Sequence, residues 1–170
     1  MTDGSPDRDL VAALSEMADR AEIMLQVCAD NRGCPAATNI GIRMAAGNDV
    51  ILLDADTVVT DGWLRGLRAA VATAPDIGTA TPLSNDAAMF SYPRRDGPNL
   101  CPNPGSLAEL ARLAAKANRG EFVEVPAGHG FCLYIRAECL EETGLLRPKA
   151  DAALTWPVCR VAYPEAAILY

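Results

Sequence analysis

The chain has 170 residues, which corresponds to about one domain and is long enough to bury roughly 70% of its unfolded surface. Its hydrophobic content of 50% and charged content of 22% are those of an ordinary globular protein. The net charge is −7 and the basic residues are scattered along the chain, which argues against a nucleic-acid-binding protein.

The sequence carries no sign of a membrane anchor or a secretion signal. No apolar stretch approaches the ~20 residues of a transmembrane helix, and the acidic N-terminus lacks the basic start and apolar middle of a signal peptide. We therefore predict a cytoplasmic protein. The six cysteines form no Cys-x-x-Cys pair, so their spacing favours reduced, mostly packed thiols. His129 and Cys132 make only a weak candidate metal pair, because no second pair of ligands accompanies them.

The first half of the chain alternates helical and strand-like patterns. Residues 5–20 predict a helix with Ser5 as its N-cap, followed by a short strand at 23–27. A glycine turn at Gly33 then precedes a helix that we expect from about residue 35 to 47. The pattern is typical of α/β proteins.

A buried strand is predicted at residues 50–53, which are apolar and rich in β-branched side chains. Thr60 can cap the helix that follows. The apolar stripe expected on this helix comprises Trp63, Leu64, Leu67 and Val71.

The second half continues the alternation after a long loop. Residues 77–83 predict a short strand, and residues 84–105 predict a loop that we expect to be the least ordered internal segment. Ser106 and Glu109 form a capping box for the next helix. The remaining elements are predicted as strands at 121–126 and 130–135 and a helix at 136–144. Together these patterns predict a mostly parallel sheet with helices on its faces.

Two aspartates, Asp54 and Asp56, follow the buried strand at 50–53. Side chains two positions apart on a strand point the same way, so both carboxylates can reach one point at the carboxyl edge of the sheet, where α/β proteins bind ligands. Such a pair suits Mg²⁺ or Mn²⁺. On the pattern alone, an equally good reading is that Asp56, with Thr57, only begins the next loop.

Three segments resemble, in order, the family-2 glycosyltransferases of the GT-A fold, especially the rhamnosyltransferase-like members. They are "NRGCPAATNIGIRMAAGNDVILLDADTVVTDGWLRGL", "GTATPLSNDAAMFSYP" and "VPAGHGFCLYIRAECLEETGLL". The resemblance covers about residues 2–147, and it predicts a partial GT-A domain over residues 1–147 with a divergent tail at 148–170.

The resemblance implies a GT-A-like three-layer α/β/α fold and an inverting, metal-dependent transfer of sugar from a nucleotide diphosphate sugar to a hydroxyl of a glycan or other acceptor. Asp54 and Asp56 would hold the metal and, through it, the donor diphosphate. Asp3 would contact the nucleoside, or serve only as a turn residue. Asn39 would lie near the donor, or be a plain helix-surface residue. The resemblance also puts His129 on the acceptor side, although a lone histidine between glycines is more often a loop residue.

The pattern of the family breaks at both ends of this sequence. The acidic segment that supplies the base in such enzymes has no counterpart after residue 146, where Asp151 and Glu165 are the only carboxylates. The strand and nucleotide-contacting loop that open the family's domain also lack a counterpart, so we expect an incomplete domain whose catalytic base is unknown.

Two other functions fit part of the same residues. A non-catalytic nucleotide-binding remnant would explain the missing base. A phosphatase of the haloacid dehalogenase type would use Asp54 as nucleophile and Asp56 as general acid. It also needs a downstream lysine and a late acidic pair, and no acidic pair follows Lys149.

Overall fold

The computed structural model describes residues 2–94, 99–100, 103–117, 121–125 and 127–146, and the backbone of residues 161–162. The chain divides into two compact units. Unit 1 comprises Met1–Gly47 with Leu145–Ala150, and unit 2 comprises Asn48–Gly144 with Asp151–Tyr170. No helix in the described part of the chain combines the length and apolar character needed to span a bilayer.

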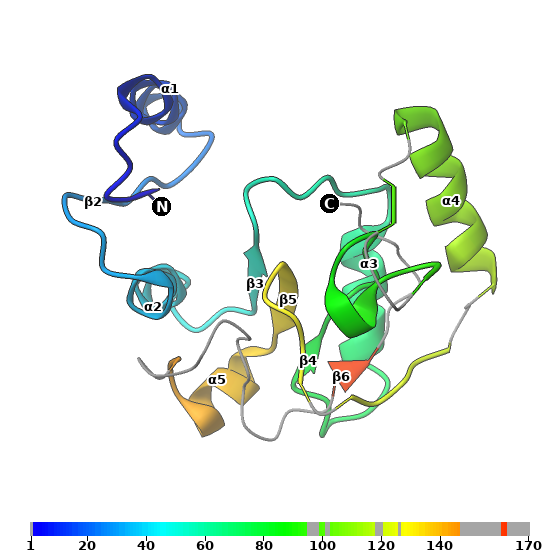
Figure 1. The fold of residues 1–170 in the computed structure, drawn as a ribbon. Helices are drawn as coiled ribbons and strands as arrows, with labels where there is room; N and C mark the ends of the chain where they lie inside the picture. The colour runs from blue at the N-terminus through cyan, green and yellow to red at the C-terminus, as the bar shows by residue number, and fades with distance from the viewer. Residues whose placement is uncertain are drawn as a thin grey trace. The chain divides into compact units, whose positions relative to one another are not determined.

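Unit 1 contains two helices and a small parallel sheet (Figure 1). Strand β1 (Thr2–Asp3) pairs in parallel with β2 (Val27–Cys28). Helix α2 (Cys34–Met44) begins after Gly33, as predicted. Helix α1 (Arg8–Asp19) begins after Asp7 and not after Ser5, because the Asp7 carboxylate accepts two backbone N–H groups at 3.0 Å.

Unit 2 contains a sheet of four strands in the order β3-β5-β4-β6. The strands are β3 (Val50–Leu53), β4 (Thr79–Ala80), β5 (Cys132–Ile135) and β6 (Val161–Ala162). The central strand β5 runs antiparallel to β3 and β4, and only β4 and β6 pair in parallel. The α/β class is therefore confirmed, whereas the prediction of a mostly parallel sheet is wrong for this sheet.

Strand β5 is antiparallel to β4, so the chain leaves β4 and enters β5 at the same edge of the sheet. Thr81 directly follows β4, and its Oγ1 donates to the carbonyls of Cys132, at 2.7 Å, and His129, at 3.4 Å. Residues 121–125, predicted as a strand, form no continuous strand. The chain therefore enters β5 from the edge at which β3 and β4 end.

The core of unit 2 lies between the sheet and α3 (Trp63–Val71). This helix begins after Gly62 and not at Thr60. Leu67 is fully buried against the sheet, whereas Leu64 is 40% exposed, so the predicted apolar stripe is wrong at Leu64. The buried cluster includes Leu67, Ala70, Val71, Ile77, Phe90, Phe131, Cys132 and Tyr134.

The long loop predicted at 84–105 forms several hydrogen bonds among its described residues, while residues 95–98 and 101–102 lie outside the described part, so its predicted low order stays a prediction. It contains a short 3-10 helix, η1 (Ala88–Phe90), and its Ser84, Asn85 and Ser91 are buried. The loop leads to α4 (Pro104–Ala117), and α5 (Ala137–Thr143) follows β5. The capping box predicted for α4 is not formed. Asn103, the residue before the helix, caps it instead, because its Oδ1 accepts the Ser106 N–H at 3.0 Å.

The cysteines follow the prediction in part. Cys28, Cys34 and Cys132 are free thiols, as expected from their spacing. Cys139 is disulfide-bonded, so the prediction of reduced thiols is wrong at this position. Sequence spacing missed it because a disulfide depends on spatial proximity, which residue spacing does not report.

Candidate functional site

Asp54 and Asp56 lie at the carboxyl end of β3, as the sequence predicted. The Asp54 N–H donates to Phe131 O at 2.9 Å, which extends the β3–β5 pairing by one residue to the edge of the sheet. The chain turns at once, because the Thr57 N–H donates to Asp54 O at 3.1 Å. Both aspartates are exposed, so their carboxylates are accessible to a ligand.

The electrostatics of this pair are unfavourable without a counter-charge. Partial burial raises the pKa of Asp54, and the nearby charge of Asp56 raises it further, while His129 has the opposite effect. Neither carboxylate forms an ion pair with a lysine or arginine in the described ranges. A divalent cation would remove this repulsion.

His129 lies close enough to Asp54 for the two side chains to affect each other's protonation. Its ring packs between Phe90 and Phe131, at centroid distances of 6.1 Å and 5.5 Å. The proximity to Asp54 is a direct result of the antiparallel β5, which places the residues before β5 beside those after β3. In a parallel arrangement His129 would lie at the opposite edge.

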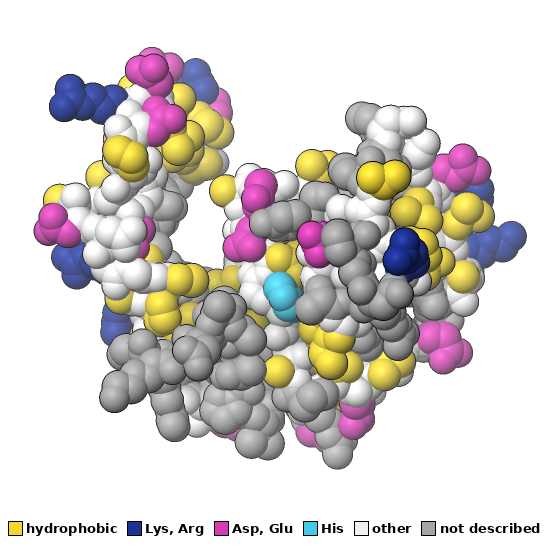
Figure 2. Space-filling view, viewed as in Figure 1, with side chains coloured by type: hydrophobic (Ala, Val, Ile, Leu, Met, Phe, Trp, Pro, Cys, Tyr) yellow, Lys and Arg dark blue, Asp and Glu magenta, His cyan; other side chains and the backbone are white. Residues whose placement is uncertain are grey.

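The protonation state of His129 is defined by its surroundings. Burial lowers the pKa of the imidazole, and the charge of Asp54 opposes that effect. Nδ1 accepts the Phe131 N–H at 3.4 Å, so the neutral ring carries its proton on Nε2. The imidazole of this single histidine reaches the surface (Figure 2), where Nε2–H can donate to a ligand.

The two carboxylates suit a hard divalent cation whose remaining coordination positions are filled by a bound substrate. Within the described residues no group of three or more histidine, cysteine, aspartate or glutamate side chains is placed to hold a metal. Cys132 is fully buried, and burial together with the Asp54 charge raises the pKa of its thiol to about 12, so this thiol is protonated at neutral pH when no metal is bound. Two carboxylates are nevertheless the usual protein contribution to Mg²⁺ when substrate phosphates complete the shell.

Asp3 and Asn39 lie in unit 1, where both side chains hold the backbone. The Asp3 carboxylate accepts the N–H groups of Arg32, at 2.8 Å, and Gly33, at 3.0 Å. The Asn39 side-chain amide donates to Leu146 O at 2.8 Å and accepts the Leu146 N–H at 2.9 Å. Their predicted contacts with the sugar donor stay predictions.

The role of His129 was underestimated from the sequence, and the residues that contact it were not identified. Sequence analysis favoured a loop role for His129 and did not single out Thr81, which binds the His129 carbonyl, or the two phenylalanines beside the ring. No clear sequence signal marked Thr81, because it lies inside the strand predicted at residues 77–83, whereas the observed strand β4 ends at Ala80. Asp151 and Glu165, considered for the missing base, lie outside the described residues.

Comparison with known protein families gives a match over most of the chain. The sequence profile described as "Glycosyl transferase family 2" matches residues 1–144. Searches of curated proteins and of solved structures gave no match.

Proposed function

This chain belongs to glycosyl transferase family 2, and we propose from that premise that Asp54 and Asp56 bind the diphosphate of a nucleotide sugar through Mg²⁺ or Mn²⁺. Membership of the family supports a glycosyltransferase enzyme in the general sense. The metal dependence, the nucleotide sugar donor, the glycan or other hydroxyl acceptor and an inverting course are parts of the proposal.

The observation that carries the proposal is the uncompensated pair of carboxylates. Asp54 and Asp56 are exposed at one edge of the sheet, and Asp56 raises the pKa of Asp54. Such repulsion lowers stability without an evident structural gain, as is common where a fold is built around a ligand. When bound there, the cation would neutralise charge on the diphosphate leaving group.

In the proposed transfer, the acceptor hydroxyl oxygen forms a bond to the anomeric carbon of the donor sugar. The bond from that carbon to the diphosphate breaks, and the nucleoside diphosphate leaves with the electron pair. The acceptor proton passes to a base that is not identified. His129 does not fit that role, because its Nδ1 accepts the Phe131 N–H and its Nε2 carries a proton. We propose instead that Nε2–H donates a hydrogen bond to the donor diphosphate.

The test is binding of a nucleoside diphosphate with and without Mn²⁺, measured by titration calorimetry and by denaturant unfolding. At a ligand concentration a hundred times the dissociation constant, we expect the free energy of unfolding to rise by ~2.7 kcal/mol. Asp54→Asn and Asp56→Asn should each abolish the dependence on Mn²⁺. Asp61→Asn is the matched control, since it removes an exposed carboxylate from the same loop.

Equal binding by the wild-type protein and the two site variants would contradict the proposal. Binding that depends on Mn²⁺ but is never followed by sugar transfer would favour the non-catalytic alternative. Release of phosphate from simple monoesters would favour the phosphatase alternative.

A further inference from the structure

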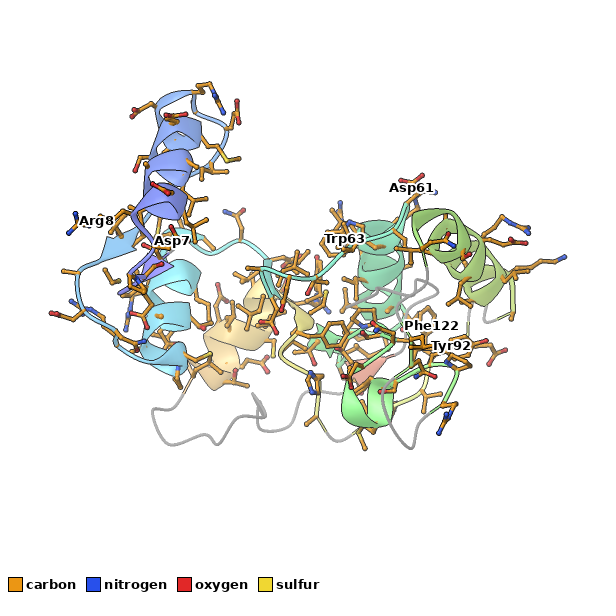
Figure 3. All side chains as sticks on the ribbon, turned by 45° about the horizontal axis from the view of Figure 1, so that its top comes forward. Asp7, Arg8, Asp61, Trp63, Tyr92 and Phe122 are labelled. Carbon is orange, nitrogen blue, oxygen red and sulfur yellow. The ribbon has the colours of Figure 1, made fainter. Side chains whose placement is uncertain are left out.

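A groove of about 1020 Å³ separates α4 from the loop at 58–62 and the first turns of α3, entirely within unit 2. Figure 3 shows Asp61 on the side of α3 that faces α4, whereas Trp63 points away from it. The groove does not include Asp54, Asp56 or His129. Its volume lies at the upper end of the range of small-molecule sites.

The walls of the groove are apolar and made largely of small residues. Val58 and Val59, which are 54% and 38% exposed, form one wall, and Leu107 and Ala111 lie in the other. The residues of α3 and α4 that line the groove include glycine and alanine, such as Gly66. Larger side chains at these positions would fill the space. The apolar surface is therefore open to a ligand.

Three basic side chains line the same groove. Arg65, Arg112 and Lys116 are all exposed, and none forms an ion pair with a described residue. Asp61 is the one carboxylate among the lining residues, so three positive charges against one negative charge leave a local charge of +2. This is the opposite of the whole chain, whose net charge is −7.

We propose that this groove binds an amphipathic anion, a single apolar chain with a phosphate head group. Apolar walls suit a hydrocarbon chain, and unpaired arginine and lysine side chains suit a phosphate. Free glycans fit less well, because the groove offers few polar groups apart from these charges. The unpaired positive charge also disfavours a neutral or cationic ligand.

The groove and the candidate metal site share one loop of the chain, since Val58, the first lining residue, follows Asp56 by two residues. A ligand in the groove would thus lie next to the loop that carries one of the carboxylates. We assign it as the lipid-like part of the acceptor, an assignment that rests on the proposed transfer reaction. Binding itself requires neither nucleotide nor metal.

The test is titration calorimetry with dodecyl phosphate below its critical micelle concentration, with nucleotide and metal absent. A neutral dodecyl glucoside is the ligand control. We expect the phosphate to bind more tightly than the glucoside, and the double variant Arg112→Ala/Lys116→Ala to weaken phosphate binding about tenfold. Arg68→Ala is the matched control, because Arg68 is an exposed arginine of α3 that does not line the groove.

A second variant tests the apolar wall separately from the charges. Ala108 lines the groove and is exposed, so Ala108→Phe should fill the space without disturbing the core and should weaken both ligands. Equal affinity for phosphate and glucoside, or no effect of either variant, would overturn the proposal. So would binding that appears only with micelles or anionic vesicles, since that reports a charged surface. Loss of Mn²⁺-dependent nucleotide binding alone would overturn the proposed function and leave the groove site standing.

Discussion

The two units of this chain are stabilised in different ways. Unit 2 has a contiguous buried cluster between α3 and the sheet, and all four residues of β5 are buried. Unit 1 has a two-stranded sheet, and no residue of α1 is buried. Its order depends more on polar side chains that hold the backbone, such as Asp3 and Asn39. Burial of apolar side chains thus stabilises unit 2, which carries the candidate metal site, while hydrogen bonds from polar side chains stabilise unit 1.

The largest expected difference between the units is in the effect of removing a leucine side chain. Leu67→Ala should lower the free energy of unfolding by about 2–5 kcal/mol, because Leu67 is fully buried. Leu10→Ala should change it by about 0.5 kcal/mol or less, because Leu10 on α1 is 48% exposed. Guanidinium unfolding followed by circular dichroism measures both. Equal effects would show that α1 of unit 1 also packs into an apolar core.

A smaller effect on stability is expected from removing the hydrogen bonds between Asn39 and Leu146 in unit 1. Asn39→Ala removes both hydrogen bonds to Leu146, a buried residue, and should destabilise this segment by about 1–2 kcal/mol. Hydrogen exchange should accelerate in α2 and around residues 145–146 and stay unchanged in β3 and β5. Thr38→Ala, at the neighbouring helix position, is the control. Faster exchange throughout both units would show that Asn39 stabilises the whole chain and not unit 1 alone.

The smallest effect concerns a polar pair inside unit 2. The Tyr134 hydroxyl donates to the Asp49 carboxylate. Burial, followed by this hydrogen bond and the Asp49 charge, raises the pKa of Tyr134 to about 12. Because the pKa in the folded state exceeds that of a free tyrosine, about 10, the stabilisation is complete below pH 10 and is lost as the pH rises through 12.

Stability measured between pH 9 and pH 12 tests this pair. The wild-type protein should lose stability over that range more steeply than Tyr134→Phe, which lacks the titrating group. At neutral pH the substitution should cost about 1 kcal/mol, because the Asp49 carboxylate is exposed and can be hydrated instead. Identical pH profiles for the two proteins would show that Tyr134 titrates normally.

Much of the local structure could be predicted from the sequence. The strand at 50–53, the helix after Gly33 and the helix that ends at Gly144 are formed where local patterns placed them, although the prediction of a buried strand is wrong at Leu53, which is 43% exposed. Helix starts were less predictable, because several polar residues compete for each cap and tertiary packing selects one, as with Asp7 over Ser5. The direction of β5 could not be predicted, because it depends on the path of the fifty residues before it.

Of the candidate site, only the two aspartates could be predicted from the sequence. Asp54 and Asp56 are two residues apart and directly follow a strand, so local geometry places them together. His129 is far from them in sequence, and only the antiparallel pairing of β3 with β5 brings it near. The groove beside α4 was missed because alanine and glycine on facing helices give no sequence signal of unfilled space.

The most direct test of the central claim is an NMR titration of the imidazole of His129 with Mn²⁺. Because His129 is the single histidine and lies near Asp54, a paramagnetic ion held by Asp54 and Asp56 should strongly broaden its resonances. Diamagnetic Mg²⁺ should reverse the broadening by competition, and the double variant Asp54→Asn/Asp56→Asn should not show it. Sharp imidazole resonances at saturating Mn²⁺, or equal broadening in the double variant, would contradict a metal site at this edge of the sheet.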